Sequence, residues 1–255
     1  MAATPERRRF LLRALAAGGA LLLSGCERLS RSAWFPDVLA RAERLTHAAQ
    51  RLVVGRAALA QEFTEADISP RFRSNGTAEP RSAAYQALAD RDFADYRLEV
   101  RGLVAQPLSL TLAEVRALPG RTQITRHDCV EGWSAIGKWK GARLAALLAL
   151  ARPHPEARYV VFRCADPMDA GGTLYYESID LDDAYHEQTL LAYELNGAPL
   201  PIANGAPLRL RVERQLGYKM AKYVMAVELV ASFAGIGGGK GGYWEDQGYE
   251  WYAGI

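Results

Sequence analysis

This chain of 255 residues has only three cysteines, and it lacks the common metal-ligand spacings and nucleotide-binding glycine motifs. No C-x-x-C, H-E-x-x-H or C-x-x-C-H spacing occurs, so zinc, iron–sulfur and c-type haem sites are unsupported. No G-x-G-x-x-G follows a predicted strand and no P-loop is present, which leaves nucleotide cofactors unsupported too. The glycine-rich run at 237–242 lacks the strand–loop–helix pattern that a phosphate-binding loop needs.

The chain also lacks an excess of charge of one sign. The formal net charge is +2, with 49% hydrophobic and 24% charged residues. This composition is that of a soluble globular protein and excludes disordered, collagen-like and disulfide-stapled chains. The first 25 residues carry a net charge of +3, because Arg7, Arg8, Arg9 and Arg13 are opposed only by Glu6, which leaves 2 − 3 = −1 for the rest of the chain. The nearly neutral remainder gives no electrostatic reason to expect a nucleic-acid partner.

The first 26 residues are basic and then apolar, which predicts an export signal peptide. Arg7 and Arg8 begin a segment that resembles the twin-arginine motif, although Glu6 precedes them where that motif has Ser or Thr. Leu23–Cys26 resembles a lipobox, which predicts lipidation of Cys26. We therefore expect the protein in the periplasm or on the outer side of the cytoplasmic membrane, lipid-anchored if Cys26 is modified. An uncleaved N-terminal anchor is the alternative. Because the twin-arginine route carries folded proteins, it points to a cofactor inserted before export.

Residues 27–63 are predicted to form an amphipathic stalk helix, because apolar residues recur every three or four positions between 37 and 60. Thr64–Asp90 shows no clear period and reads as a long loop, and loops of that length are often functional. Residues 64–255 are predicted to form one domain.

Strand patterns dominate from Tyr96 onward, beginning with alternating apolar and charged residues at 96–101. Further strands are expected at 159–162, 190–193, 208–212 and 223–230. Thr111 and Glu114 form a capping box before a short helix, and another helix contains the leucines at 144–148. Because strands outnumber helices and do not alternate with them, we expect an α+β fold with mixed sheets and flanking helices. The glycine-rich and aromatic C-terminal segment is predicted to lie on the domain as a strap.

Two interpretations of the cysteines need no cofactor. In an oxidising compartment Cys129 and Cys164 could form a disulfide. His127 and Asp128 next to Cys129 could instead serve a cysteine hydrolase, although neighbours in sequence rarely have the required geometry.

Three ordered motifs support a different interpretation. The run Arg126–Ser134, followed by Trp139-x-Gly141, resembles the molybdenum-ligand segment of the sulfite-oxidase superfamily, most closely its bacterial periplasmic members. Leu195–Pro201 with Asn204–Arg209, and then Gly217–Tyr223, resemble two further segments of that family. The resemblance covers about residues 64–233.

The resemblance implies a sulfite-oxidase-type domain that binds molybdenum–molybdopterin. Cys129 would be the metal ligand, a soft sulfur donor that suits molybdenum. His127 and Glu131 would flank it as catalytic residues, with Trp133, Tyr175, Tyr176, Trp251 and Tyr252 as further pocket candidates. The implied cofactor-binding residues are Phe72, Arg73, Asn75, Cys129, Cys164, Asn204, Arg209, Lys219, Met220 and Lys222.

The implied activity is oxygen-atom transfer on a small S-oxide, N-oxide or sulfite-like substrate. The negative charge of Glu131 disfavours sulfite and favours a neutral oxide. A separate electron partner, either a membrane haem protein or a cytochrome c, would complete the reaction. The alternatives are a non-catalytic lipoprotein or a thiol/disulfide protein that keeps the fold. In those cases Arg209, Lys219 and Lys222 would be solvated surface residues.

Overall fold

The computed structural model describes residues 29, 32 and 34–255, which fall into two compact units, one up to Val53 and one from Val54 to Ile255. The predicted export signal, with Arg7, Arg8 and Cys26, lies outside the described residues. Among the helices that are described, none is long and apolar enough to cross a membrane.

The first unit contains helix α2 (Phe35–Val53). Its amphipathic pattern predicted a helix to about residue 60, but the helix ends at Val53. The sequence continues with Val54 and Gly55, and β-branched residues and glycine both have low helix propensity. Residues 54–63 belong instead to the second unit, where Glu62 forms a β-bridge with Thr125.

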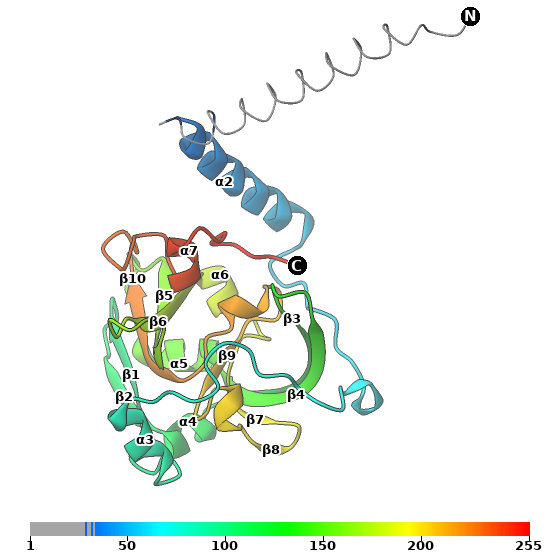
Figure 1. Cartoon of the computed structure of the whole chain (residues 1–255), viewed down its shortest axis with the longest axis vertical. Coiled ribbons are helices and arrows are strands. Elements are labelled where there is room, and N and C mark those ends of the chain that lie inside the picture. Colours follow the sequence, from blue (N-terminus) through cyan, green and yellow to red (C-terminus); the bar gives the residue numbers. More distant parts are fainter. Residues whose placement is uncertain (1–28, 30–31, 33) are drawn as a thin grey trace, which may run out of the picture. The chain divides into compact units, whose positions relative to one another are not determined.

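The second unit is built on two five-stranded sheets, within the residues that the structure describes (Figure 1). The first sheet has, in order, β2 (Leu108–Thr111), β1 (Arg97–Gly102), β10 (Val224–Val230), β5 (Tyr159–Pro167) and β6 (Leu174–Asp180). It is mixed, because β1 pairs parallel to β10 while its other pairings are antiparallel. The second sheet is antiparallel and contains β3 (Gly120–Asp128), β4 (Ser134–Arg143), β7 (Leu190–Leu195), β8 (Ala198–Pro199) and β9 (Arg209–Arg211).

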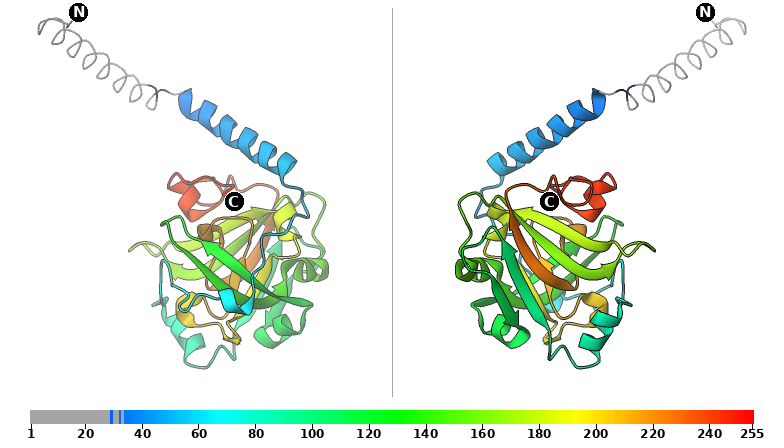
Figure 2. Two further views of the ribbon diagram at one scale, coloured as in Figure 1. Left: turned by 90° about the vertical axis from the view of Figure 1, so that its right-hand side faces the viewer. Right: turned by 90° about the vertical axis from the view of Figure 1, so that its left-hand side faces the viewer.

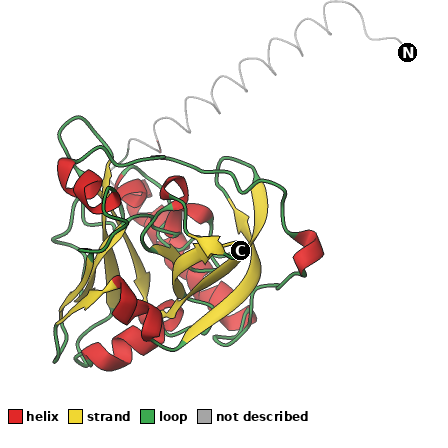
Figure 3. Ribbon diagram, turned by 90° about the horizontal axis from the view of Figure 1, so that it is seen from below, coloured by secondary structure: helices red, strands yellow, loops and turns green. Residues whose placement is uncertain are grey.

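Short helices lie beside the two groups of strands (Figure 3). They are α3 (Ala83–Ala89), α4 (Leu112–Ala117), α5 (Leu144–Ala151), α6 (Leu181–Ala184) and α7 (Tyr243–Asp246), with 3-10 turns η1 (Glu65–Asp67), η2 (Ile202–Asn204) and η3 (Gly217–Lys219). The capping box at α4 is confirmed: the Glu114 N–H donates to Thr111 Oγ1 at 3.2 Å, and the Thr111 N–H donates to Glu114 Oε2 at 2.7 Å. The expected α+β class is therefore confirmed.

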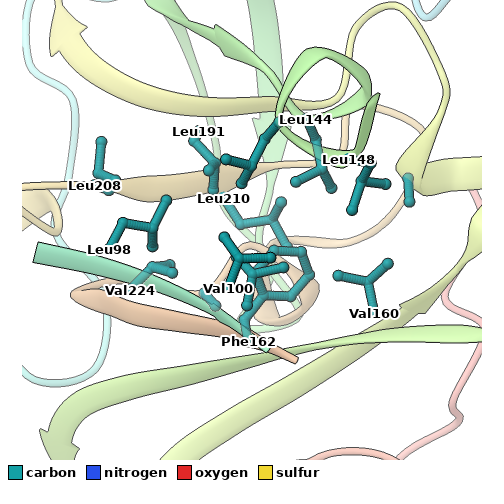
Figure 4. Close-up of a cluster of buried hydrophobic side chains, with 14 of the residues drawn as sticks. Leu98, Val100, Leu144, Leu148, Val160, Phe162, Leu191, Leu208, Leu210 and Val224 are labelled. Carbon is teal, nitrogen blue, oxygen red and sulfur yellow. The ribbon is translucent and has the colours of Figure 1, made fainter. Parts of the chain in front are cut away.

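Apolar side chains from both sheets and from α5 form the main core (Figure 4). Leu98 and Val100 of β1 are at most 1% exposed, whereas Arg97 and Glu99 between them are exposed, as the alternation predicted. Burying each such side chain contributes about 1.5–3 kcal/mol. The core fixes the two sheets against each other, and the loops at their ends are thereby held in place.

The predicted loop at 64–90 is shorter than expected, because α3 occupies its end. The Ser82 hydroxyl accepts a hydrogen bond from the Tyr85 N–H at 3.3 Å and caps that helix. The preceding residues run along the β3–β4 hairpin, where the Ser69 N–H donates to the Ile136 carbonyl at 3.0 Å. This path carries residues 72–77 to the candidate site.

Candidate active site

A cleft lies in the second unit, where segments far apart in sequence converge. The loop at 75–77, the turn at 129–131, the ends of β5 and β6, the segment 217–222 and the C-terminal segment all contribute. The red C-terminal segment lies beside β5 and β6 (Figure 2). The lining residues are Asn75, Gly76, Thr77, Cys129, Val130, Glu131, Asp166, Met168, Tyr175, Gly217, Tyr218, Met220, Ala221, Lys222, Trp244 and Tyr249.

Cys129 is presented by a tight turn between β3 and β4. Its N–H donates to the Trp133 carbonyl at 2.9 Å, and the Gly132 N–H donates to the Cys129 carbonyl at 3.0 Å. Gly132 has φ +82°, a backbone conformation that glycine adopts readily. Cys129 is 7% exposed, and burial raises the pKa of its thiol, while a backbone hydrogen bond at Glu131 acts in the opposite direction. The thiol thus reaches the cleft on a fixed backbone.

Several buried polar atoms near this cleft have no hydrogen-bond partner among the described residues. They are Asn75 Oδ1, His127 Nε2, Asp166 Oδ1, Asn204 Nδ2, and Nε and Nη2 of Arg209. Buried polar groups are nearly always hydrogen-bonded, and each unpaired group costs about 1–3 kcal/mol. Donors and acceptors that are buried near a cleft without a hydrogen-bond partner are suited to binding a polar ligand.

Two buried cations lie within this polar group. Lys222 Nζ donates to the carbonyls of Asn75 at 2.7 Å and Ala203 at 3.1 Å, and also to that of Thr77. Arg209 is 0% exposed and its Nη1 donates to the Asn204 carbonyl at 3.1 Å. Burial and the neighbouring cations lower the pKa of Lys222 to about 7 and that of Arg209 to about 9. An anionic ligand would relieve this mutual repulsion.

Residues 85–234 match the sequence profile of the family described as the oxidoreductase molybdopterin binding domain. The chain belongs to this family. It is 39% identical over 252 residues, 98% of this chain and 88% of the relative, to the putative protein-methionine-sulfoxide reductase subunit YedZ1 of Azospira oryzae. It is 38% identical over 144 residues to the protein-methionine-sulfoxide reductase catalytic subunit MsrP of Xanthomonas campestris pv. campestris, covering 53% of this chain and 45% of that protein.

Among solved structures, the sulfane dehydrogenase SoxCD of Paracoccus pantotrophus is similar at a TM-score of 0.48 and 24% sequence identity, over 55% of this chain and 39% of that one. The expected family, fold class and class of activity are thereby confirmed by the family match: this chain is a molybdopterin oxidoreductase.

The polar groups in and near the cleft fit molybdopterin, which carries a phosphate, a pterin and two dithiolene sulfurs. Of the predicted phosphate and pterin residues, Asn75 and Lys222 line the cleft, whereas Asn204 and Arg209 are buried and do not line it themselves. The unpaired Arg209 and Asn204 donors and the Lys222 ammonium suit the phosphate, because fixed donors and positive charge favour an anion. The unpaired oxygens of Asn75 and Asp166 can accept from N–H groups of a pterin. The described residues bring together no three His, Cys, Asp or Glu side chains that could hold a metal ion by themselves.

Arg209 lies on a strand whose alternating pattern was compatible with either a cofactor-binding or a solvated arginine, and the structure decides between these two interpretations. Both Arg209 and Arg211 of β9 are 0% exposed, and both guanidinium groups lie over the Trp139 ring, at 5.5 and 4.3 Å from its centroid. Arg211 is paired with Glu213 at 2.6 Å, whereas Nε and Nη2 of Arg209 have no partner in the described part of the chain. Arg209 is therefore the arginine that remains available to a ligand.

Lys219 was expected at the cofactor, and the structure places it elsewhere. Its ammonium is 0% exposed and pairs with carboxylate oxygens of Glu177 and Glu245. Glu177 and Glu245 raise the pKa of Lys219 against the effect of burial. Burial raises the pKa of Glu177 well above its usual value, with Lys219 opposing that shift and Glu245 adding to it. Lys219 thus joins β6 to the C-terminal segment and does not line the cleft.

Cys164 was expected to line the pocket, but it lies in the main apolar core at 2% exposure. Burial raises the pKa of its thiol well above the usual value. Cys129 and Cys164 are both free thiols in the structure, so the disulfide interpretation receives no support. Asp166, two residues further along β5, lines the cleft instead.

His127 and Met220 contact each other behind the cleft wall. His127 Nδ1 is 3.1 Å from Met220 Sδ and 3.1 Å from Arg211 Nη1, so Arg211 donates to this ring nitrogen. Burial and the neighbouring Arg209 and Arg211 lower the pKa of His127 well below its usual value, so the ring is neutral. A side-chain carbon at Gly217 would lie only 2.4 Å from Nε2 of the ring. Met220 lines the cleft, whereas His127 is 0% exposed and does not.

The remaining predicted residues gather beside the Cys129 turn. Phe72 packs edge-on against Trp139 at 5.0 Å and lies 5.7 Å from His127. Arg73 lies over the Trp133 ring at 5.5 Å, and Trp133 Nε1 donates to Glu131 Oε2 at 3.0 Å. Only Glu131 of this group lines the cleft.

The other four tyrosine and tryptophan candidates have different positions relative to the cleft. Tyr175 lines the cleft and donates to the Tyr218 carbonyl at 2.5 Å. Tyr176 bonds Asp246, and Trp251 Nε1 donates to Ser178 Oγ at 2.9 Å, so both hold the C-terminal segment. Tyr252 is outside the set of lining residues.

Sequence reasoning missed several lining residues, above all Asp166, Trp244 and Tyr249. Asp166 is 5% exposed, and burial raises the pKa of its carboxyl to about 6. A carboxyl group at the end of a buried strand was the available signal. Trp244 and Tyr249 were visible only as part of an aromatic C-terminal segment, whose return to the cleft is a tertiary feature.

Proposed function

We propose that this oxidoreductase reduces S-oxides of the methionine sulfoxide type. The observation that carries the proposal is a cleft lined by the Cys129 thiol, Lys222 and aromatic rings, with the unpaired buried donors of Asn204 and Arg209 near it. The relative that matches 98% of this chain bears the name of a protein-methionine-sulfoxide reductase subunit. A neutral S-oxide also suits Glu131, whose exposed carboxylate would repel sulfite.

In this proposal Cys129 is the thiolate ligand of molybdenum, and Asn75, Asn204, Arg209 and Lys222 hold the pterin and its phosphate. When bound, the cofactor supplies a metal that changes oxidation state while the substrate gains or loses oxygen. Metal coordination favours the thiolate and offsets the raised pKa of Cys129. The rigid turn at Gly132 keeps the sulfur directed into the cleft.

Reduction of an S-oxide consumes two electrons and two protons and releases a thioether and water. Asp166 is suited to hold one of these protons, because its pKa of about 6 allows the carboxyl to take up and release a proton near neutral pH. Glu131 lies on the exposed side of the cleft and can exchange protons with solvent. The electrons would come from a separate membrane haem protein or a cytochrome c.

The test of this activity is reduction of methionine sulfoxide by protein purified from a host that makes the cofactor, with reduced viologen as electron donor. We expect turnover with methionine sulfoxide and none with sulfite and an oxidised acceptor. Sulfite oxidation without S-oxide reduction would overturn the proposal. Molybdenum content measured on the same preparation distinguishes a protein that holds the cofactor but lacks the activity from a protein that lacks the cofactor.

We also propose that the protein works outside the cytoplasm, exported through Arg7 and Arg8, with Cys26 as the site of a lipid anchor. The support is the pattern of the first 26 residues. Replacing Cys26 by Ala should abolish labelling by a fatty-acid probe and release the protein in soluble form. Unchanged labelling would refute Cys26 as the site of the lipid anchor, whereas the proposed export does not depend on this result.

A further inference from the structure

One wall of the cleft is formed by stacked aromatic rings that the proposed chemistry does not use. Trp244 and Tyr249 both line the cleft, with ring centroids 5.4 Å apart and ring planes 29° apart. Tyr218, another lining residue, meets the edge of Tyr249 at 5.2 Å and 88°. Tyr243 packs edge-on against Trp244 at 5.3 Å from behind. The result is a continuous aromatic surface.

The aromatic wall is held by a segment that is anchored on both sides. Glu245, next to Trp244, pairs with the buried Lys219. Asp246 accepts a hydrogen bond from the Gly238 N–H at 2.6 Å and bonds Tyr176. These contacts fix the wall as a preformed surface.

Closer to Tyr249, Tyr218 Oη donates to the Glu250 carbonyl at 2.6 Å. The Leu216 N–H donates to the Ala253 carbonyl at 2.9 Å, so both ends of this stretch are bound to the segment that carries Tyr218. The three rings of the wall therefore keep a fixed relation to one another.

The remaining lining residues differ in chemistry. Cys129, Asp166 and Lys222 supply the groups suited to the cofactor and to proton transfer. Toward solvent, Val130 is 47% and Tyr249 38% exposed, and the Glu131 carboxylate next to Val130 in sequence is exposed as well, so the open mouth combines apolar surface with a carboxylate. Aromatic faces and edges attract methyl, methylene and sulfur groups.

We propose that Trp244, Tyr249 and Tyr218 are the specificity-determining residues of this enzyme. They bind the apolar carbon substituents of the S-oxide, so that the sulfur–oxygen group is directed toward Cys129. This inference rests on the proposed S-oxide reduction and adds the substrate feature that is selected: an extended thioether chain, bound by aromatic contact at the open mouth of the cleft.

The test compares Trp244→Ala with the wild-type holoenzyme on two substrates of different length. N-acetylmethionine sulfoxide has a chain that can reach the wall, whereas dimethyl sulfoxide carries only two methyl groups. We expect KM for N-acetylmethionine sulfoxide to rise about tenfold and KM for dimethyl sulfoxide to change less than twofold, with kcat for both largely kept. Trp244→Phe, which keeps an aromatic face, should restore most of the affinity.

Trp34→Ala is the matched control, because Trp34 is a 59% exposed tryptophan of the first unit and does not line the cleft. It should leave both KM values unchanged. Equal KM changes for the two substrates in Trp244→Ala, or a KM change in Trp34→Ala as large as in Trp244→Ala, would overturn the proposal.

A second measurement is independent of turnover. Binding of the product thioether, N-acetylmethionine, to molybdenum-loaded protein is measured by equilibrium dialysis. We expect about tenfold weaker binding to Trp244→Ala than to wild type, and equal binding would refute the aromatic wall. If the wild type binds the thioether through Trp244 but reduces no S-oxide, the proposed reaction fails while the binding role stands.

Discussion

Lys219 and Lys222 are three residues apart, and the structure gives them opposite roles that a pair of substitutions can separate. Lys219 is buried between Glu177 and Glu245, whereas Lys222 lines the cleft. We predict that Lys219→Met destabilises the fold and that Lys222→Met impairs cofactor retention. Methionine keeps most of the side-chain volume, so the change removes the charge with little loss of packing.

The magnitude for Lys219 follows from its complete burial. Removing one partner of a buried ion pair costs about 3–5 kcal/mol, because the remaining charge is left without compensation. Here two carboxyl groups would remain, and both would have to be protonated or repel each other. For a domain of this size each kcal/mol shifts Tm by about 2–4 °C, so Tm of the apoprotein should fall by about 6–20 °C.

Lys222 should respond differently. Its pKa of about 7 means that its charge is already disfavoured by burial and by Arg209, so at pH 8 the apoprotein loses little charge stabilisation by its removal. The cost that remains is that the carbonyls of Asn75, Thr77 and Ala203 lose their donor. An anionic phosphate would stabilise the charge of Lys222 when the cofactor is bound. Lys222→Met should therefore lower cofactor occupancy by tenfold or more while its apoprotein Tm falls less than that of Lys219→Met.

The assay measures Tm of the apoprotein by calorimetry at pH 8 and pterin content of protein loaded with cofactor. Lys219→Met combined with Glu177→Gln should recover part of the lost stability, because one unpaired carboxylate is removed. The reasoning is refuted if Lys219→Met keeps the wild-type Tm but loses cofactor, which would return Lys219 to the phosphate site that the family resemblance implied.

Three further outcomes are expected. Cys129→Ser should keep the pterin but abolish turnover and alter the Mo(V) signal. Cys164→Ser should keep that signal and lose about 1–3 kcal/mol of stability, because a hydroxyl enters the apolar core. Equal effects of the two variants on the Mo(V) signal would contradict the placement of Cys164 in the core. Burial raises the pKa of Asp166 from 3.8 to about 6, so the free energy of unfolding of the apoprotein, measured by urea denaturation, should fall by about 1 kcal/mol between pH 5 and pH 7.5. Asp166→Asn should remove that fall, and the same pH dependence in both proteins would contradict the raised pKa of Asp166. Replacing Arg7 and Arg8 by Lys should leave folded precursor in the cytoplasm, and normal export would exclude the twin-arginine route.

Local sequence patterns predicted strands β1, β5, β7, β9 and β10 and helices α4 and α5, and the family motifs indicated the class of the cofactor. The alternation at 96–101 and the capping box at Thr111 each specify their conformation within a few residues, and both appear as expected. The β3–β4 hairpin was missed. Its strands alternate charged and apolar residues less cleanly, because Gln123, Thr125 and His127 are buried polar residues.

The direction and partners of single side chains were decided only by the tertiary structure. Arg209 and Lys219 are both basic residues in family motifs, yet one keeps unpaired donors beside the cleft and the other is neutralised by Glu177 and Glu245. Those carboxylates lie 42 and 26 residues away along the chain, beyond any local pattern. The sequence by itself determined which chemistry the motifs could provide. Packing of distant segments decided which of their residues reach the cleft, because burial and ion pairing depend on neighbours that only the folded chain brings together.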